Sequence, residues 1–241
     1  MRIILFMMVF MVNSLIAISL TPLYHTMDDK RELKTMFTVQ NSSNRPVAVK
    51  FAVLALVDTD NNRESRVASS KVNFYPSQFV LDAKSSKNVR VSYLGKSLPK
   101  VEEVYRVVAN ELNVNVADKK IIKKEDNKIS GSLTMRFSYA GLLFVRDASA
   151  KAHLKVESFQ QLSDGTVEIV IVNNGTASTL MSSKQYSLKV MVNNQLYTLD
   201  ENDLKNSQFR RILPHKSNRY ILKDIQSLPK GTITSIRVEK R

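Results

Sequence analysis

The sequence predicts an all-β fold of two β-sandwich domains that meet at an angle with a cleft between them. From Leu33 to the C-terminus, apolar and polar residues alternate with the period of two that β-strands require, and a helical period is not evident. Turn-forming residues interrupt this alternation at intervals of roughly 8–12 residues, which is typical of sandwiches. The alternation stops after Arg146 and restarts at His153, which indicates a linker near 146–151.

Seven or so short segments in the first half have strand character. They are residues 36–41, 47–58, 71–76, 79–81, 89–94, 104–114 and 132–145. The strongly polar stretch 59–66 separates two of them. Asp58, Asp60 and Asn62 resemble the start of a calcium loop, but Arg63 stands where the loop requires glycine. We therefore expect a turn there and no bound metal.

The second half repeats the alternating pattern on a smaller scale. Its predicted strands are residues 153–162, 166–175, 186–192, 196–199, 209–213, 219–223 and 232–240. Ser-Asp-Gly at 163–165 and Asn-Asn-Gly at 173–175 supply turn residues that tolerate positive φ, and Asn-Asn-Gln at 193–195 is a further predicted turn. No helix longer than a turn or two is expected.

The first residues have the layout of a secretory leader. Arg2 precedes an apolar run and a small-residue exit, and Asn13 and Ser14 interrupt that run. The run is well short of the roughly 20 residues that a membrane-spanning helix needs, which favours a leader over an anchor. Cleavage fits after Ala17 or after Ser19. We expect residues 1–19 to be the signal peptide, 20–147 and 148–241 to be the two domains, and the mature chain to be exported without stable membrane insertion.

The composition argues against two classes of function, nucleic-acid binding and thiol catalysis. The formal net charge is +14, but Lys and Arg are spread along the chain, there is no Trp, and aromatic residues make up only 7%. Nucleic-acid binding favours basic residues interleaved with stacking aromatics, so we expect no nucleic-acid partner. Cysteine is absent, which excludes thiol catalysis and disulfide support of the fold.

No constellation of catalytic or cofactor-binding residues is evident. His25, His153 and His215 are far apart in sequence and lack neighbours at metal-ligand spacing. The chain has six glycines and no phosphate-binding glycine loop. A serine triad remains open on sequence alone, so an exported hydrolase stays an alternative. We expect a non-enzymatic binding protein without cofactor or metal.

Several segments resemble the periplasmic pilus chaperones of the chaperone–usher family. They are SLTP (19–22), FTVQNSSNRPVAV (37–49), FYPSQFVLDAKSSKNVRVSYL (74–94), EEVYRVVANEL (102–112), LTMRFSYAGLLFV (133–145) and, in the second half, IVNNGTAS (171–178). The end of the 133–145 segment is most similar to the archaic or alternative branches. The resemblance implies two immunoglobulin-like domains and a periplasmic chaperone for pilus or fimbrial subunits. A tandem immunoglobulin-like surface or adhesive protein is the alternative.

The resemblance also implies a mechanism and its residues. The last strand of the first domain is lent to a pilin that lacks a strand, and the complex is passed to an outer-membrane usher. Arg136 takes the position that anchors the C-terminal carboxylate of the subunit, and Tyr24 stands where the family has a second basic anchor. The expected donor side chains are Ile129, Leu133, Met135 and Phe137. An outward-facing strand arginine and ordinary core packing are the alternatives for Arg136 and for the apolar set.

Overall fold

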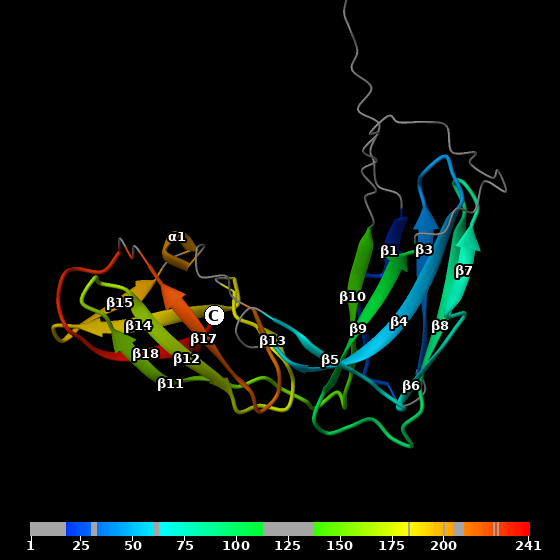
Figure 1. The fold of residues 1–241 in the computed structure, drawn as a ribbon. Helices are drawn as coiled ribbons and strands as arrows, with labels where there is room; N and C mark the ends of the chain where they lie inside the picture. The colour runs from blue at the N-terminus through cyan, green and yellow to red at the C-terminus, as the bar shows by residue number, and fades with distance from the viewer. Residues whose placement is uncertain are drawn as a thin grey trace, which may run out of the picture.

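A computed structural model shows two β-sandwiches, joined end to end at an angle (Figure 1). It describes residues 18–29, 33–59, 63–112, 137–182, 184–199, 201–204, 210–223, 225 and 227–241. The one helix in these ranges is the single turn α1, Glu201–Leu204. In the described part of the chain, no helix has the length and hydropathy needed to cross a bilayer. The prediction of two angled, all-β, immunoglobulin-like sandwiches is confirmed.

Two sheets face each other in the first domain. One has the order β1-β3-β8-β6, formed by Ile18–Thr21, Lys34–Asn41, Ser86–Tyr93 and Val72–Tyr75. The other has the order β2-β10-β9-β4-β5, formed by Tyr24–Met27, Ser138–Val145, Glu103–Glu111, Val47–Asp58 and Ser65–Ala68, and β7 (Gln78–Leu81) also pairs with β4. The chain crosses from one sheet to the other between β1 and β2, so its first strands border both sheets.

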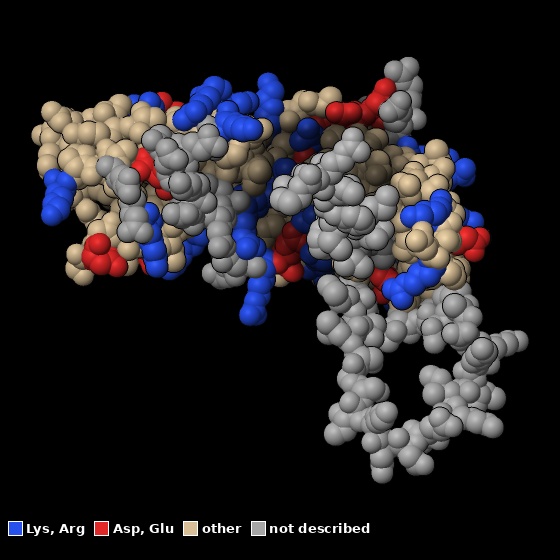
Figure 2. Space-filling view, turned by 90° about the horizontal axis from the view of Figure 1, so that it is seen from above, with Lys and Arg blue, Asp and Glu red and all other residues tan. Residues whose placement is uncertain are grey.

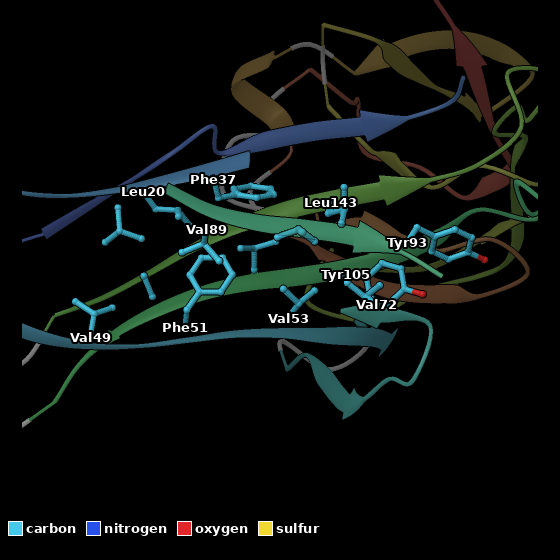
Figure 3. Packing of buried hydrophobic residues seen from close by; sticks show 14 of the residues in the cluster. Leu20, Phe37, Val49, Phe51, Val53, Val72, Val89, Tyr93, Tyr105 and Leu143 are labelled. Carbon is cyan, nitrogen blue, oxygen red and sulfur yellow. The ribbon is translucent and has the colours of Figure 1, made fainter. Parts of the chain in front are cut away.

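Alternation along the strands builds the first core. In β4, Val47, Val49, Phe51 and Val53 are buried, while Lys50 between them is exposed. Phe51 packs against Phe37 and Phe74, with ring centroids 6.4 and 5.8 Å apart. Figure 3 shows Phe37, Phe51 and Val53 between the two sheets, with Leu143 of β10 close to them. The period of two in the sequence therefore marks the inner faces of the sandwich.

The second domain has its own core and three small sheets. Their orders are β11-β12-β17 (Leu154–Gln161, Val167–Asn173, Ser217–Leu222), β13-β16 (Thr179–Leu180, Arg211–Ile212) and β15-β14-β18 (Gln195–Leu199, Tyr186–Val192, Ile233–Lys240). The buried core residues run from Leu154 to Ile236 and include Ile169, Ile171 and Leu188. Gly165 has positive φ (83°), as the turn chemistry predicts, whereas Asn-Asn-Gly at 173–175 does not. In the predicted turn at 193–195, Asn193 (φ 49°) and Asn194 (φ 62°) have positive φ.

The expected strands correspond closely to observed ones, but β2, β5 and β13 were not among them. Residues 47–58 form β4 with the predicted bounds. The polar stretch 59–66, expected to be a loop and turn, runs into β5 at Ser65, and all four residues of β5 are exposed. A strand that buries no side chain has no alternation of apolar residues, so periodicity could not reveal it.

Ile18 determines which predicted cleavage site suits the fold. Its side chain is 0% exposed in the first core, and its backbone pairs with Asn41 of β3. Cleavage after Ser19 would remove this side chain, and losing a buried isoleucine costs roughly 2–5 kcal/mol. The fold therefore favours cleavage after Ala17 over cleavage after Ser19 as the end of the predicted leader. Intact-mass measurement of the protein after expression with its leader tests this, and a chain that begins at Leu20 would contradict it.

Candidate functional site: the open edge of β10 and the domain junction

Strand β10 contributes to two different clusters through its two faces. Leu143 and Val145 are buried in the first core, and Tyr139 is half-buried against it. Leu142 and Phe144 face the other way and are buried with Leu56, Val104 and Leu213 in a small cluster where the domains meet. Because neighbouring strand residues point to opposite faces, one strand joins the first core to the domain junction.

One edge of β10 is only half covered. On one side, β9 pairs with the whole strand from Ser138 to Val145. On the other side, β2 pairs in parallel with Leu142–Val145. Among the described strands, none pairs with residues 138–141 on that second side. This half of β10 therefore presents backbone donors and acceptors to which a further strand can add.

Gly141 marks where the covered half begins. The backbone of Leu23, just before β2, accepts a hydrogen bond from the Leu142 amide at 2.8 Å. A Cβ atom on Gly141 would lie only 2.9 Å from the carbonyl oxygen of Leu23 and 3.3 Å from that of Pro22. Glycine is therefore what allows the crossing between β1 and β2 to pass this close to β10.

The predicted donor residues lie mostly outside the described ranges. Ile129, Leu133 and Met135 are not among the described residues, and neither is Arg136. Phe137 is described and is half-buried against the first core. It therefore packs within the first domain itself, as the core-packing alternative requires. Ser138, which follows it, pairs with Asn110, at the end of β10 furthest from the linker.

Tyr24 lies in a row of side chains on the junction-facing side of the second sheet. Leu142 is the cross-strand neighbour of both Tyr24 and Arg106, and Leu54 follows Arg106 on the next strand. Cross-strand neighbours have Cβ atoms about 4.5–5.5 Å apart and share one face of the sheet. Tyr24 is 66% exposed, so a ligand can reach this residue.

A buried ion pair holds the two domains together. Glu102 lies just before β9 and its side chain is fully buried. It accepts hydrogen bonds from Arg146 Nη1 at 2.6 Å and from the Ser178 amide at 2.9 Å, and the Ser178 hydroxyl also donates to it. Ser178 belongs to the second domain, so one carboxylate ties the first domain to the linker and to the second domain.

Arg211 adds a cation to the same junction. Its guanidinium carbon lies 4.7 Å from the centroid of the Phe144 ring, and its Nη1 donates to the Ser178 hydroxyl at 3.1 Å. Burial lowers the pKa of Arg211, and the carboxylate of Glu102 partly opposes this. The Thr59 hydroxyl donates to the Arg211 carbonyl at 2.7 Å, which adds another bond across the junction.

Arg106 projects from the middle of β9 and pairs with Glu64. Its Nε lies 3.1 Å from Glu64 Oε2, and its Nη2 contacts the other carboxylate oxygen. Arg66 donates to the same carboxylate at 2.6 and 2.9 Å. Burial alone would raise the pKa of Glu64, but hydrogen bonds and charge from Arg106 and Arg66 outweigh it and hold that pKa below its ordinary value.

No pattern in the sequence predicts a role for Glu102, Arg106 or Arg211. Arg106 did carry a signal, because it is a basic residue inside the otherwise apolar run of β9. Basic side chains are also spread over both domains in Figure 2, so composition alone does not distinguish these three. Among the described residues, no group of three His, Asp or Glu side chains has the geometry to hold a metal.

Comparison with known proteins identifies the family. Residues 18–150 match the model described as "Pili and flagellar-assembly chaperone, PapD N-terminal domain". No curated protein matches the sequence. One similar solved structure is the CsuC–CsuE complex of a chaperone and a tip subunit from the archaic chaperone–usher Csu pili of Acinetobacter baumannii. Its TM-score is 0.61 at 16% identity, over 91% of this chain and 90% of that chain.

Two further solved structures share the fold. A chaperone–tip adhesin complex of CFA/I fimbriae biogenesis has a TM-score of 0.57 at 15% identity, over 93% of this chain and 91% of that chain. The E. coli chaperone DraB has a TM-score of 0.51 at 19% identity, over 90% of this chain and 86% of that chain. The family model itself spans more than half of the sequence, and so this chain belongs to the family of pili and flagellar-assembly chaperones with a PapD N-terminal domain.

Proposed function

We propose that the protein is a periplasmic chaperone that holds pilus subunits by donor-strand complementation and passes them to an outer-membrane usher. The observation that carries the proposal is the open edge of β10 at residues 138–141, beside a first core that continues to Phe137. A subunit that lacks one strand of its sandwich exposes an apolar groove and unpaired strand edges. A strand lent by the chaperone satisfies both, through main-chain hydrogen bonds and alternate apolar side chains.

The half-covered edge favours one direction for the added strand. Strand β2 runs parallel to β10 and pairs with it from Leu142 onward. A subunit strand that pairs with residues 138–141 and runs parallel to β10 would reach the N-terminal end of β2. It must end there, because β2 occupies the edge from Leu142 onward. Its C-terminal carboxylate would then arrive beside Tyr24 and Leu142. The Tyr24 hydroxyl can donate a hydrogen bond to it.

The donor residues remain those that the sequence suggests. Ile129, Leu133 and Met135 have the same parity as Tyr139 and Leu143, which face the first core. Continued alternation upstream would direct these three side chains into the groove of the subunit. The core of the subunit would then extend the core of the first domain. Arg136 has the opposite parity, that of Leu142 and Phe144. It lies six positions before Leu142, so a subunit strand that ends at β2 places its C-terminal carboxylate beyond Arg136. We therefore propose Arg136 as an anchor for the added strand itself, and Tyr24 as the residue beside its terminal carboxylate.

Alanine replacement along the donor segment tests the proposal. Burying one such side chain in a subunit is worth roughly 1.5–3 kcal/mol, so Leu133→Ala or Met135→Ala should weaken subunit capture about tenfold or more. Thr134→Ala, of opposite parity, is the matched control and should change capture little. The measurements are co-purification of a small β-rich subunit from periplasmic extract and the melting temperature of each variant.

Three results would contradict the assignment. If Leu133→Ala and Met135→Ala lower the melting temperature but leave capture per folded molecule unchanged, those residues belong to the core and are not donors. If Arg136→Ala captures subunits as well as the unmodified protein does, Arg136 is not an anchor. Absence of any co-purifying subunit would favour a tandem-domain surface protein over a chaperone.

A further inference from the structure

The linker between the two domains, residues 146–153, is held by backbone hydrogen bonds at both of its ends. At its start, the Arg146 amide donates to the Met27 carbonyl at 3.1 Å, so the linker leaves the first domain beside β2. At its end, the linker lies against residues 173–178 of the second domain, which we call the junction loop. Two amides of this loop donate to the Lys151 carbonyl, at 2.8 and 3.2 Å. A connection that is fixed at both ends transmits the orientation of one domain to the other.

Asn173 holds the junction loop from inside. Its side chain is fully buried, and its NH₂ group donates to the carbonyls of Ala177 and Ile212, at 2.8 and 3.2 Å. Its side-chain oxygen accepts from the amides of His153 and Gly175, both at 3.0 Å. These bonds use both donors and both lone pairs of the amide group. One buried side chain therefore fixes the path of the loop and joins the loop to the end of the linker.

The junction loop also binds the first domain, just before β9. The Thr176 carbonyl accepts a hydrogen bond from the Glu102 amide at 2.8 Å, and the Ser178 amide donates to the Glu102 carboxylate at 2.9 Å. Thr176 holds the linker as well, because its hydroxyl accepts from the Lys151 amide at 3.2 Å. The linker, the junction loop and the first domain therefore contact one another in a closed triangle. A change in the angle between the domains must break hydrogen bonds on at least one side of that triangle.

Gly175 allows the linker to lie this close to the junction loop. The residue is buried, and a Cβ atom on it would overlap the Lys151 carbonyl oxygen. The same atom would lie 2.5 Å from the His153 amide nitrogen and 2.8 Å from the carbonyl carbon of Ala152. All three neighbours are backbone atoms, which cannot swing aside as the tip of a flexible side chain can. Gly175 does not have positive φ, so the closeness of the linker, and not the backbone conformation, excludes a side chain here.

The angle between the domains matters for the proposed subunit site, because the second domain lies beside that site. A strand that adds to residues 138–141 would end next to Leu142 of β10. Leu142 packs in the same buried cluster as Leu213 of the second domain. A rotation of the second domain would therefore move Leu213 relative to the place where the added strand ends.

We propose that Asn173 and Gly175 are positioning residues that clamp the linker, so that the angle between the two domains is set before a subunit binds. The inference rests on the proposed function and adds to it the residues that give the binding surface one shape. If the clamp is loosened, only a fraction of the molecules has the binding angle at any moment. The apparent affinity for the subunit then falls in proportion to that fraction.

Gly175→Ala tests the clamp, because the added methyl group would push the linker away from the junction loop. The chain has no cysteine, so Gln40→Cys in β3 and Ser235→Cys in β18 provide one exposed labelling site in each domain. Double electron–electron resonance between spin labels at these two sites measures the distance between the domains in the purified protein. We expect one narrow distribution of distances with glycine at position 175 and a wider or displaced distribution with alanine. We also expect Gly175→Ala to capture, per folded molecule, roughly three- to tenfold less tightly the subunit that co-purifies with the unmodified protein.

Gly231→Ala is the matched control, because Gly231 contacts Gln161 at the end of β11 furthest from the linker. There an added Cβ atom would meet the side chain of Asn193, which can move aside. This variant should keep the narrow distribution of distances. Thr176→Val is a milder second variant, which removes the hydroxyl that accepts from the Lys151 amide and keeps the shape of the side chain. It should widen the distribution less than Gly175→Ala does.

The outcomes separate this inference from the proposed function. A distribution in Gly175→Ala that matches the unmodified protein in mean and width overturns the clamp, and so does equal widening in Gly231→Ala. A wider distribution with unchanged capture per folded molecule overturns the positioning role. If the unmodified protein captures no subunit, the proposed function fails, and the distances alone still decide whether the clamp exists. Should Gly175→Ala not fold, Thr176→Val decides between the same outcomes.

Discussion

Replacing Glu102 with alanine should lower the free energy of unfolding by about 3–5 kcal/mol, the range for breaking a buried ion pair by removing one partner. The substitution leaves the Arg146 guanidinium without its carboxylate and the Ser178 amide without its acceptor. Both groups lie where the domains meet, so the loss also weakens the contact between them. Urea unfolding followed by circular dichroism measures the change.

Glu168→Ala is the control for this result. Glu168 forms a more exposed pair with Arg219, in which the nitrogen–oxygen distance is 3.5 Å. Exposed pairs contribute about 0–1 kcal/mol, so this variant should unfold almost as the unmodified protein does. If Glu102→Ala shifts the unfolding midpoint no more than Glu168→Ala does, the buried pair does not hold the junction.

Phe51→Ala should have an effect of similar size in the first domain. The side chain is 1% exposed and packs between Phe37 and Phe74, so its removal leaves a cavity that the sheets cannot fill. Such truncations cost roughly 3–5 kcal/mol. In a thermal scan we expect the first domain to unfold earlier, while the second domain, whose core is separate, keeps its own transition.

Val67→Ala is the matched surface control, because Val67 lies on the edge strand β5 and is 49% exposed. It should change the free energy of unfolding by less than about 0.5 kcal/mol. A Phe51→Ala variant that melts together with this control would mean that the predicted cavity is filled by movement of the sheets.

The sequence predicts the parts of the fold that bury a repeating face. Strand β4 is an almost continuous apolar run of twelve residues, and its bounds were predicted to the residue. Strand β5 was missed because each of its residues is exposed, β2 because only Met27 in it is buried, and β13 because it has only two residues. A strand that is stabilised by backbone pairing alone leaves little trace in side-chain periodicity.

The candidate site was less predictable because its contacts span long distances in sequence. Glu64 and Arg106 are separated by 42 residues, and Glu102 and Ser178 by 76. The fold brings the two residues of each pair together over these long separations. No local spacing in the sequence therefore indicates that they are partners. Tyr24 was singled out through a family resemblance, and it lies in the same cross-strand row as Leu142 and Arg106.

The two faces of β10 fix the register in which a further strand can add to its open half. Leu142 and Phe144 fix the strand at the domain junction, and Leu143 and Val145 fix it in the first core. A shift of the strand by one residue would exchange these two sets, and a shift by two would put Ala140 and Gly141, or Arg146 and Asp147, into one position of each set. The position of the strand along its own axis is therefore set by side chains on its covered half. A strand that adds to residues 138–141 would therefore pair with backbone groups whose positions are already fixed.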